Sequence, residues 1–137
     1  MNLRRKHYIC QMRFTYPKNE KLKSQSTIDS LFSIGKSVSK YPLRLVYVPI
    51  ALENDEKIKF GVSVSKKNFK HAVDRNYFKR VLRETYRLNK YLLIDNLDQP
   101  YAIMFFYQTK DRLSYQEIEQ KTIQIFEKFI VQIKSEK

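Results

Sequence analysis

The feature that most constrains the fold is a basic amphipathic stretch in the middle of the chain. Residues 66 to 90 contain nine Lys or Arg and two acids, and so supply +7 of the net charge of +13. At about 100° per residue, their pattern predicts a single helix. The cations gather on an arc of about 140°. They are Arg75, Lys79, Arg80, Arg83, Arg87 and Lys90, with Asn76 between them and Tyr86 at the margin. The opposite arc is predicted to pack on a core; it carries Tyr77, Phe78, Val81, Leu82, Thr85 and Leu88.

The spacing of these charges favours a polyanionic partner over a solvated helix surface. Cations recur at four-residue intervals from Arg75 to Arg87. Like charges at this spacing cost a few tenths of a kcal/mol per pair in the free protein, and an anionic ligand would remove that cost. An anionic membrane surface is the weaker alternative, because the apolar arc is predicted to be core and carries no Trp. RNA or DNA is therefore the predicted partner.

Composition restricts the remaining classes. A chain of 137 residues suits one domain with a real core. A lone cysteine, Cys10, excludes an internal disulfide framework and fits a reducing cytoplasm. Two histidines and one cysteine make no zinc set, and no apolar run approaches the roughly 18 residues of a membrane span. Residues 1–20 carry many cations without a clean period, which predicts a flexible basic arm before a domain of residues 21–137.

The scaffold pattern predicts an α+β domain. A short helix is expected after Ser26, ending at Gly35. Strands are expected at residues 43–50, 57–65 and 101–107. Ser114 begins a capping box for a last helix that runs to about residue 133. The acids of residues 53–56 are predicted to lie in a solvated hairpin loop. One sheet with helices packed on it is the expected result.

No catalytic constellation accompanies this scaffold. Two histidines and an N-terminal cysteine give no persuasive nucleophile–base arrangement. The acids do not cluster as metal ligands, and no Gly-rich phosphate loop is present. A nuclease acting alone is therefore disfavoured. A nucleic-acid-binding module is favoured, with a general or ribosomal RNA-binding scaffold and a DNA-binding helix as alternatives.

One motif carries a resemblance to a known family. Ser63-Val64-Ser65-Lys66-Lys67 is followed by Arg75-Asn76, Lys79-Arg80 and Arg83-Glu84. This pattern resembles the signature of the protein subunit of bacterial ribonuclease P, and the resemblance extends over about residues 20–131. It implies a single-domain α/β sandwich of a four-stranded sheet and three helices. It also implies a left-handed crossover through the basic helix, against the usual handedness.

The resemblance also implies a function. Holoenzymes of this family remove the 5′ leader from precursor tRNA in the cytoplasm. Their RNA subunit carries the active site and requires Mg²⁺, so no catalytic residue is expected in this chain and the protein alone should be inactive. Its expected partners are the RNA subunit and the leader, and it should promote Mg²⁺ binding. The alternative is a general or ribosomal RNA-binding scaffold without a role in cleavage.

Site residues carried over from the family fall into two groups. Those expected to bind the RNA subunit are Ser65, Lys66, Lys67, Lys70, Arg75, Asn76, Lys79, Arg80, Arg83 and Arg87. Those expected to bind the leader are Ile28, Phe32 and either Val46 or Tyr47. Ile28 stands where the family has an aromatic residue, and plain core is the alternative for Phe32 and Val46. Asn76 is suited to a base edge, a 2′-hydroxyl or a hydrated Mg²⁺, with local helix capping as the alternative.

Overall fold

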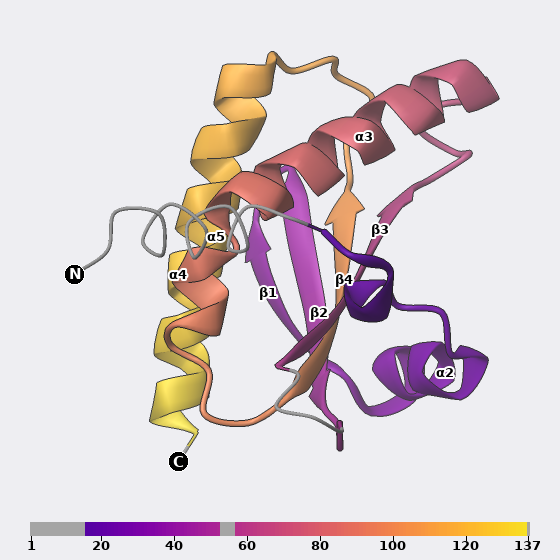
Figure 1. Ribbon diagram of the computed structural model, residues 1–137. Coiled ribbons are helices and arrows are strands. Elements are labelled where there is room, and N and C mark those ends of the chain that lie inside the picture. The colour runs from indigo at the N-terminus through magenta and orange to yellow at the C-terminus, as the bar shows by residue number, and fades with distance from the viewer. Residues whose placement is uncertain (1–15, 53–56, 137) are drawn as a thin grey trace, which may run out of the picture.

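The computed structural model describes residues 16–52 and 57–136 (Figure 1). Cys10, most of the predicted arm and the acids of the predicted loop lie outside these residues. The elements in chain order are η1 (Lys18–Glu20), α2 (Gln25–Ile34), β1 (Lys36–Lys40), β2 (Leu43–Pro49), β3 (Ile58–Val64), α3 (Ala72–Asn89), α4 (Tyr91–Ile94), β4 (Tyr101–Tyr107) and α5 (Tyr115–Ser135). No described helix is both long and apolar enough to cross a bilayer.

The strands form one mixed sheet in the order β1-β2-β4-β3. The β1–β2 and β2–β4 pairs are antiparallel, whereas β3 and β4 are parallel. The strand that comes last in the chain therefore lies inside the sheet, and α3 is the crossover between β3 and β4. The predicted hairpin between β2 and β3 is wrong, because β4 separates these two strands. The handedness of the crossover stays a prediction.

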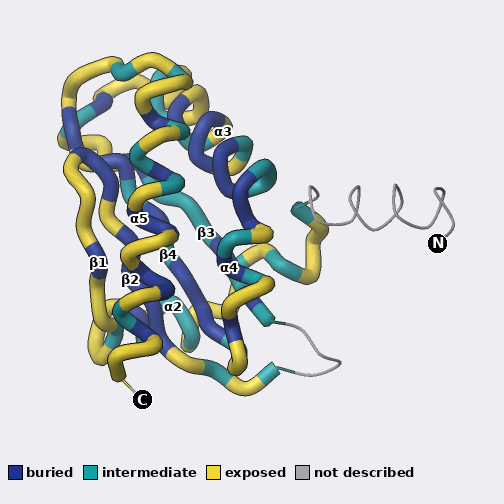
Figure 2. Tube along the Cα trace, turned by 90° about the vertical axis from the view of Figure 1, so that its left-hand side faces the viewer, coloured by how far each residue is buried: buried dark blue, intermediate teal, exposed yellow. Residues whose placement is uncertain are grey.

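Alternating side chains give the sheet two different faces. Tyr47 and Ile103 belong to the large core beneath α3 and α5. Val46, Val48 and Ala102 belong to a smaller cluster beneath α2. Figure 2 shows buried residues concentrated in β2 and β4, while β1 is exposed along most of its length. One face is therefore covered by two long helices, and the other by a single short one.

The ends of α2 differ in detail from the prediction. Its N-cap is Ser24 rather than Ser26, and the Ser24 hydroxyl accepts a hydrogen bond from the Thr27 amide. Gly35 has φ −67°, so no left-handed backbone requires glycine there. A Cβ at Gly35 would instead lie 2.2 Å from the carbonyl oxygen of Leu31. Close approach to the last helical turn explains this glycine. The Ser114 cap of α5 is confirmed, since its hydroxyl accepts from the Glu117 amide.

The basic stretch is not helical throughout, because α3 begins only at Ala72. Residues 65–71 form a turn in which the Ser65 carbonyl accepts from the amides of Asn68 and Phe69. The Phe69 ring stacks on Phe78 with centroids 4.7 Å apart, and so anchors the turn in the core. The start of the basic stretch is therefore a structured loop that leads into the helix.

Candidate nucleic-acid interface

The buried side of α3 determines which of its cations face outward. Its six buried residues are Phe78, Val81, Leu82, Thr85, Tyr86 and Asn89. Tyr86 is fully buried and stacks on Phe60 at 3.8 Å, whereas Tyr77 is 46% exposed. The buried arc is therefore rotated toward Tyr86 relative to the predicted one. The aromatic surface of Phe60 on β3 causes this rotation, and helical periodicity alone gives no sign of it.

Lys79, Arg80 and Arg83 form the open part of the basic face. Arg80 and Arg83 are exposed and Lys79 is half-buried. Within residues 16–52 and 57–136, none of the three takes part in an ion pair. Asn76 is exposed beside them, and the helix N-cap is His71, so the predicted capping role is not observed. These four side chains are available to a ligand.

Both acids of the basic stretch are paired with arginines. Asp74 accepts from Arg112 at 2.9 Å, and the Arg112 guanidinium lies 5.4 Å from the centre of the Phe78 ring. Glu84 accepts from two guanidinium nitrogens of Arg87. The hydrogen bond from Arg87 lowers the pKa of Glu84, and this bond in turn raises the pKa of Arg87. The outer face therefore presents no unpaired carboxylate from this stretch to repel a phosphate.

Lys90 does not belong to the basic face, which corrects the prediction. It is 1% exposed, and its Nζ lies 2.9 and 3.0 Å from the two carboxylate oxygens of Glu20. The Tyr86 hydroxyl donates to the same carboxylate at 2.7 Å, and burial raises the pKa of that hydroxyl well above its usual value. A buried charge requires such a partner. The partner lies 70 residues away in sequence, so no local pattern indicates it.

Arg75 is directed at the protein rather than outward. Its Nη1 donates to the carbonyl oxygens of Phe69 and Lys70, each at 2.9 Å. These bonds close the turn that carries the exposed side chains of Lys66, Lys67 and Lys70. The Ser65 hydroxyl accepts from the Lys67 amide at 3.0 Å, so it shapes the same turn. The structure places these predicted residues together at the start of α3.

The face beneath α2 holds three of the four residues predicted to bind the leader. Phe32 is 66% exposed, so the core alternative is wrong for it. Its ring meets Phe106 edge to face, with centroids 6.2 Å apart. Ile28 is half-buried on the same helix. Val46 is 5% exposed and packs in the small cluster, as the core alternative expected. Phe32 is therefore the most accessible ring on this side of the sheet.

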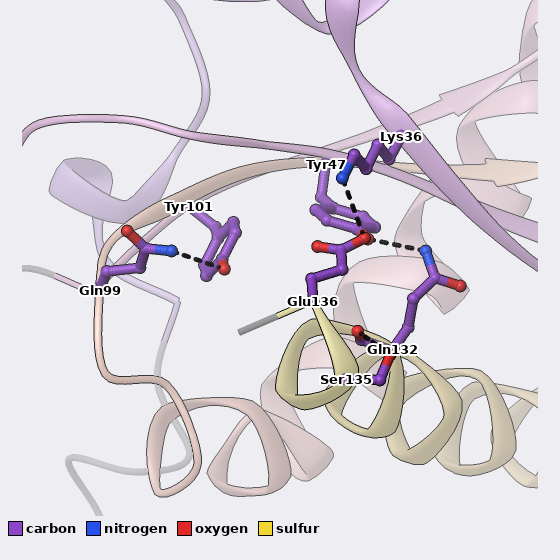
Figure 3. Close-up of polar contacts among 7 residues, drawn as sticks. All are labelled: Lys36, Tyr47, Gln99, Tyr101, Gln132, Ser135 and Glu136. Carbon is purple, nitrogen blue, oxygen red and sulfur yellow. Dashed lines mark hydrogen bonds and ion pairs between the residues drawn. The ribbon is translucent and has the colours of Figure 1, made fainter.

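Tyr47 lies on the other face and is not available there. Its hydroxyl donates to Glu136 at 2.9 Å and accepts from Gln132 at 2.7 Å (Figure 3). Lys36 pairs with the same carboxylate of Glu136 at 3.2 Å. The Tyr47 ring packs on Phe129 of α5, and burial raises its pKa to about 12. Of the two strand residues predicted for the leader, only Val46 shares a face with Phe32.

Sequence reasoning missed the contribution of the segment before α2. Tyr16 packs edge-on against Tyr86, and its hydroxyl donates to the Phe60 carbonyl. Tyr16, which falls within the predicted arm, therefore packs against the domain. No group of three or more His, Cys, Asp or Glu that could hold a metal occurs within the described ranges.

Comparisons with known proteins agree with this geometry. A family model described as Ribonuclease P matches residues 16–130. The chain is 42% identical over 105 residues to the ribonuclease P protein component of Porphyromonas gingivalis strain W83, covering 73% of this chain and 74% of that protein. It is 32% identical over 115 residues to the protein component of Dictyoglomus thermophilum, covering 84% and 92%.

Solved structures show the same fold. The ribonuclease P protein of Staphylococcus aureus matches with a TM-score of 0.64 at 19% identity, covering 79% of this chain and 93% of that one. The protein from Thermotoga maritima also matches with a TM-score of 0.64, at 20% identity and coverages of 80% and 96%. The predicted α+β sandwich is thereby confirmed. The family model and the relatives together show that this chain belongs to the family of bacterial ribonuclease P protein components.

Proposed function

We propose that this chain binds the catalytic RNA of ribonuclease P through the outer face of α3 and the turn before it. The observation that carries the proposal is the set of Lys79, Arg80 and Arg83, which have no ion-pair partner among the described residues while both acids of the stretch are paired. Arginine offers planar, bidentate donors to phosphate, and lysine adds a point charge. Lys66, Lys67 and Lys70 extend this face from an ordered turn.

The leader of precursor tRNA is proposed to lie on the face beneath α2. An exposed aromatic ring on a positively charged protein is suited to stacking with an unpaired base. Phe32 provides that ring, and Phe106 supports it from the sheet. Ile28 lies one helical turn earlier and offers apolar contact but no stacking. Val46 forms part of the floor beneath them rather than a second platform.

Cleavage is proposed to take place on the RNA subunit, with Mg²⁺ bound mainly by RNA. Mg²⁺ retains several of its waters in most sites, so a neutral amide oxygen is suited to an outer contact. Asn76 is exposed next to Arg80 and fits that role. The protein would raise Mg²⁺ affinity by holding phosphates in place. It would act in the cytoplasm, where precursor tRNA is processed.

Reconstitution tests the proposed function. The chain, a bacterial ribonuclease P RNA and both together are assayed for release of the 5′ leader at physiological Mg²⁺. We expect cleavage only with RNA present, and stimulation by the protein at low Mg²⁺. Stimulation should fall steeply with salt, since each neutralised phosphate contributes roughly −0.7 to −0.9 to the slope of log K. Binding without stimulation would support the general RNA-binding scaffold instead. Leader release by the protein alone would overturn the assignment of catalysis to RNA.

A further inference from the structure

A hollow of about 310 Å³ lies at the outer edge of β3, between the segment before α2 and the middle of α3. Lys21, Lys23 and Arg83 line it, and none of its lining residues, all within the described chain, is acidic. Three cations without a carboxylate create a potential that attracts anions. The volume lies in the range of small-ligand sites. We call this hollow the edge groove.

The walls of the edge groove are held by backbone pairing. The Leu22 amide donates to the Phe60 carbonyl at 3.1 Å, and Lys21 pairs with Phe60 in a parallel bridge. Figure 1 shows η1, immediately before this pairing, next to β3. The Lys21 ammonium lies 5.6 Å from the centre of the Tyr16 ring. The groove is therefore part of the folded domain and does not require ordering of a loose tail.

A buried ion pair fixes the start of this segment. Glu20 directly precedes Lys21, and its carboxylate accepts from Lys90 and from the Tyr86 hydroxyl. Lys90 is 1% exposed, so loss of the Glu20 charge would leave a buried cation without a partner. Glu20 is not among the residues that line the groove. The printed partners of the acid before Lys21 are thus Lys90 and Tyr86, not the lysines of the groove.

The edge groove joins the two proposed RNA-binding surfaces. Arg83 belongs to the outer face of α3, whereas Met104 packs against the small cluster beneath α2. A Cβ on Gly61 would lie 3.3 Å from both Leu22 Cβ and Met104 Sδ, so glycine leaves the floor open. An RNA strand that passes from one surface to the other has a basic path around this edge of the sheet.

We infer that the edge groove binds a phosphodiester of single-stranded RNA, and that Glu20 holds Lys21 and Lys23 in position for this binding. The inference rests on the proposed function, since it assumes RNA on both surfaces. The chemistry of the groove fits an RNA strand, with cations for the backbone and Tyr16 as one aromatic neighbour. The strand is either the tRNA leader or a single-stranded segment of the RNA subunit.

The double variant Lys21→Ala/Lys23→Ala tests the groove in the reconstituted holoenzyme. Affinities are measured for precursor tRNA, for the same tRNA without its leader, and for assembly with the RNA subunit. If both lysines neutralise phosphates on a single strand, affinity at 0.1 M salt falls up to about 25-fold and the salt slope becomes shallower by about 1.4. The matched control Lys110→Ala/Lys121→Ala removes the same charge from the β4–α5 region.

The outcomes separate the two sources of RNA. A loss confined to leader-bearing tRNA assigns the groove to the leader, and a loss in assembly assigns it to the RNA subunit. Affinities equal to those of the control in all three assays would overturn the inference. Failure of the proposed function would differ, because the wild-type protein itself would then not stimulate leader release.

Glu20→Gln tests the positioning role with the opposite charge change. The variant is one unit more positive, so simple charge attraction predicts tighter RNA binding. Displacement of Lys21 and Lys23 predicts weaker binding, by up to the same 25-fold at 0.1 M salt. Thermal unfolding monitored in parallel restricts the comparison to temperatures where the variant is folded. Tighter binding by a folded Glu20→Gln protein would refute the positioning role.

Discussion

Lysine and arginine have different roles in the middle of α3 and at its two termini. In the middle, Lys79, Arg80 and Arg83 have no ion-pair partner among the described residues. At its ends, Arg75 holds a turn and Lys90 holds the segment before α2. The difference teaches that charge on a helix face does not by itself mark a binding residue. The partner of each cation decides whether it stabilises the protein or is available to RNA.

The largest effect is expected at the C-terminal end, from Lys90→Met. This change leaves the Glu20 carboxylate poorly accessible and without its cation, and breaking one side of a buried pair costs about 3–5 kcal/mol. Urea unfolding followed by circular dichroism measures the loss. The double change Glu20→Leu/Lys90→Met removes both charges and should recover most of it. If Lys90→Met lowered the free energy of unfolding by less than about 1 kcal/mol, Lys90 would not be a cation that stabilises the fold.

The next largest effect is expected in the middle, from Arg80→Ala/Arg83→Ala. If each arginine neutralises one phosphate, affinity for the RNA subunit should fall on the order of 50-fold at 0.1 M salt. The free energy of unfolding should change by less than about 0.5 kcal/mol, as for ordinary surface substitutions. Filter binding and urea unfolding check the two halves of this prediction. An unchanged assembly constant would refute the role of the open face.

A smaller effect is expected from Arg75, which both stabilises a turn and belongs to the predicted RNA-binding residues. Arg75→Ala removes two bonds to the carbonyls of Phe69 and Lys70, which should cost about 1 kcal/mol because the site is half-exposed. Arg75→Lys keeps the charge but not the forked geometry. We expect both variants to lose RNA affinity, because the turn with Lys66 and Lys67 loosens. A fully active Arg75→Lys protein would show that charge alone matters here.

The smallest effect is expected from Arg87→Ala, since exposed ion pairs contribute about 0–1 kcal/mol. Arg87 is 36% exposed and Glu84 43%. The pKa of Glu84 is lowered from its usual 4.5, so the pair stabilises the fold above that pH and loses its contribution as the pH falls through the folded value. Unfolding curves of variant and wild type should therefore converge in acid. A constant difference down to pH 2 would contradict the pairing.

Local patterns predicted much of this fold. The strand Tyr101–Tyr107 has the predicted bounds, and Ser114 caps α5 as expected. The strand Lys36–Lys40 was missed, since its one buried residue, Val38, gives an edge strand no alternating signal. The insertion of β4 between β2 and β3 depends on contacts between distant residues, which no local period records.

The sequence predicted which kinds of residue form the candidate site more reliably than it predicted the contacts of each one. The motif placed Arg80, Arg83 and Asn76 on the open side of α3 correctly. Helical angles, rather than the motif, placed Lys90 on the same side, because they carry no information about Glu20. Tyr47 and Val46 are adjacent in a strand, so choosing between them required knowing which face of the sheet carries α2. The ion-pair partner of a cation and the face of the sheet on which a strand residue lies both depend on tertiary structure.

The position of β4 has a consequence for the order in which the protein becomes competent. Among the described strands, β3 pairs with β4 and with no other, and the core side of α3 packs on β3 and β4. A nascent chain that ends before Tyr101 therefore has no completed sheet on which to orient α3. Synthesis proceeds from the N-terminus, so the cations of α3 emerge before the surface that displays them. The fold thereby couples the display of its RNA-binding face to synthesis of the chain through β4, and chains terminated before β4 lack an ordered face with which to occupy RNA.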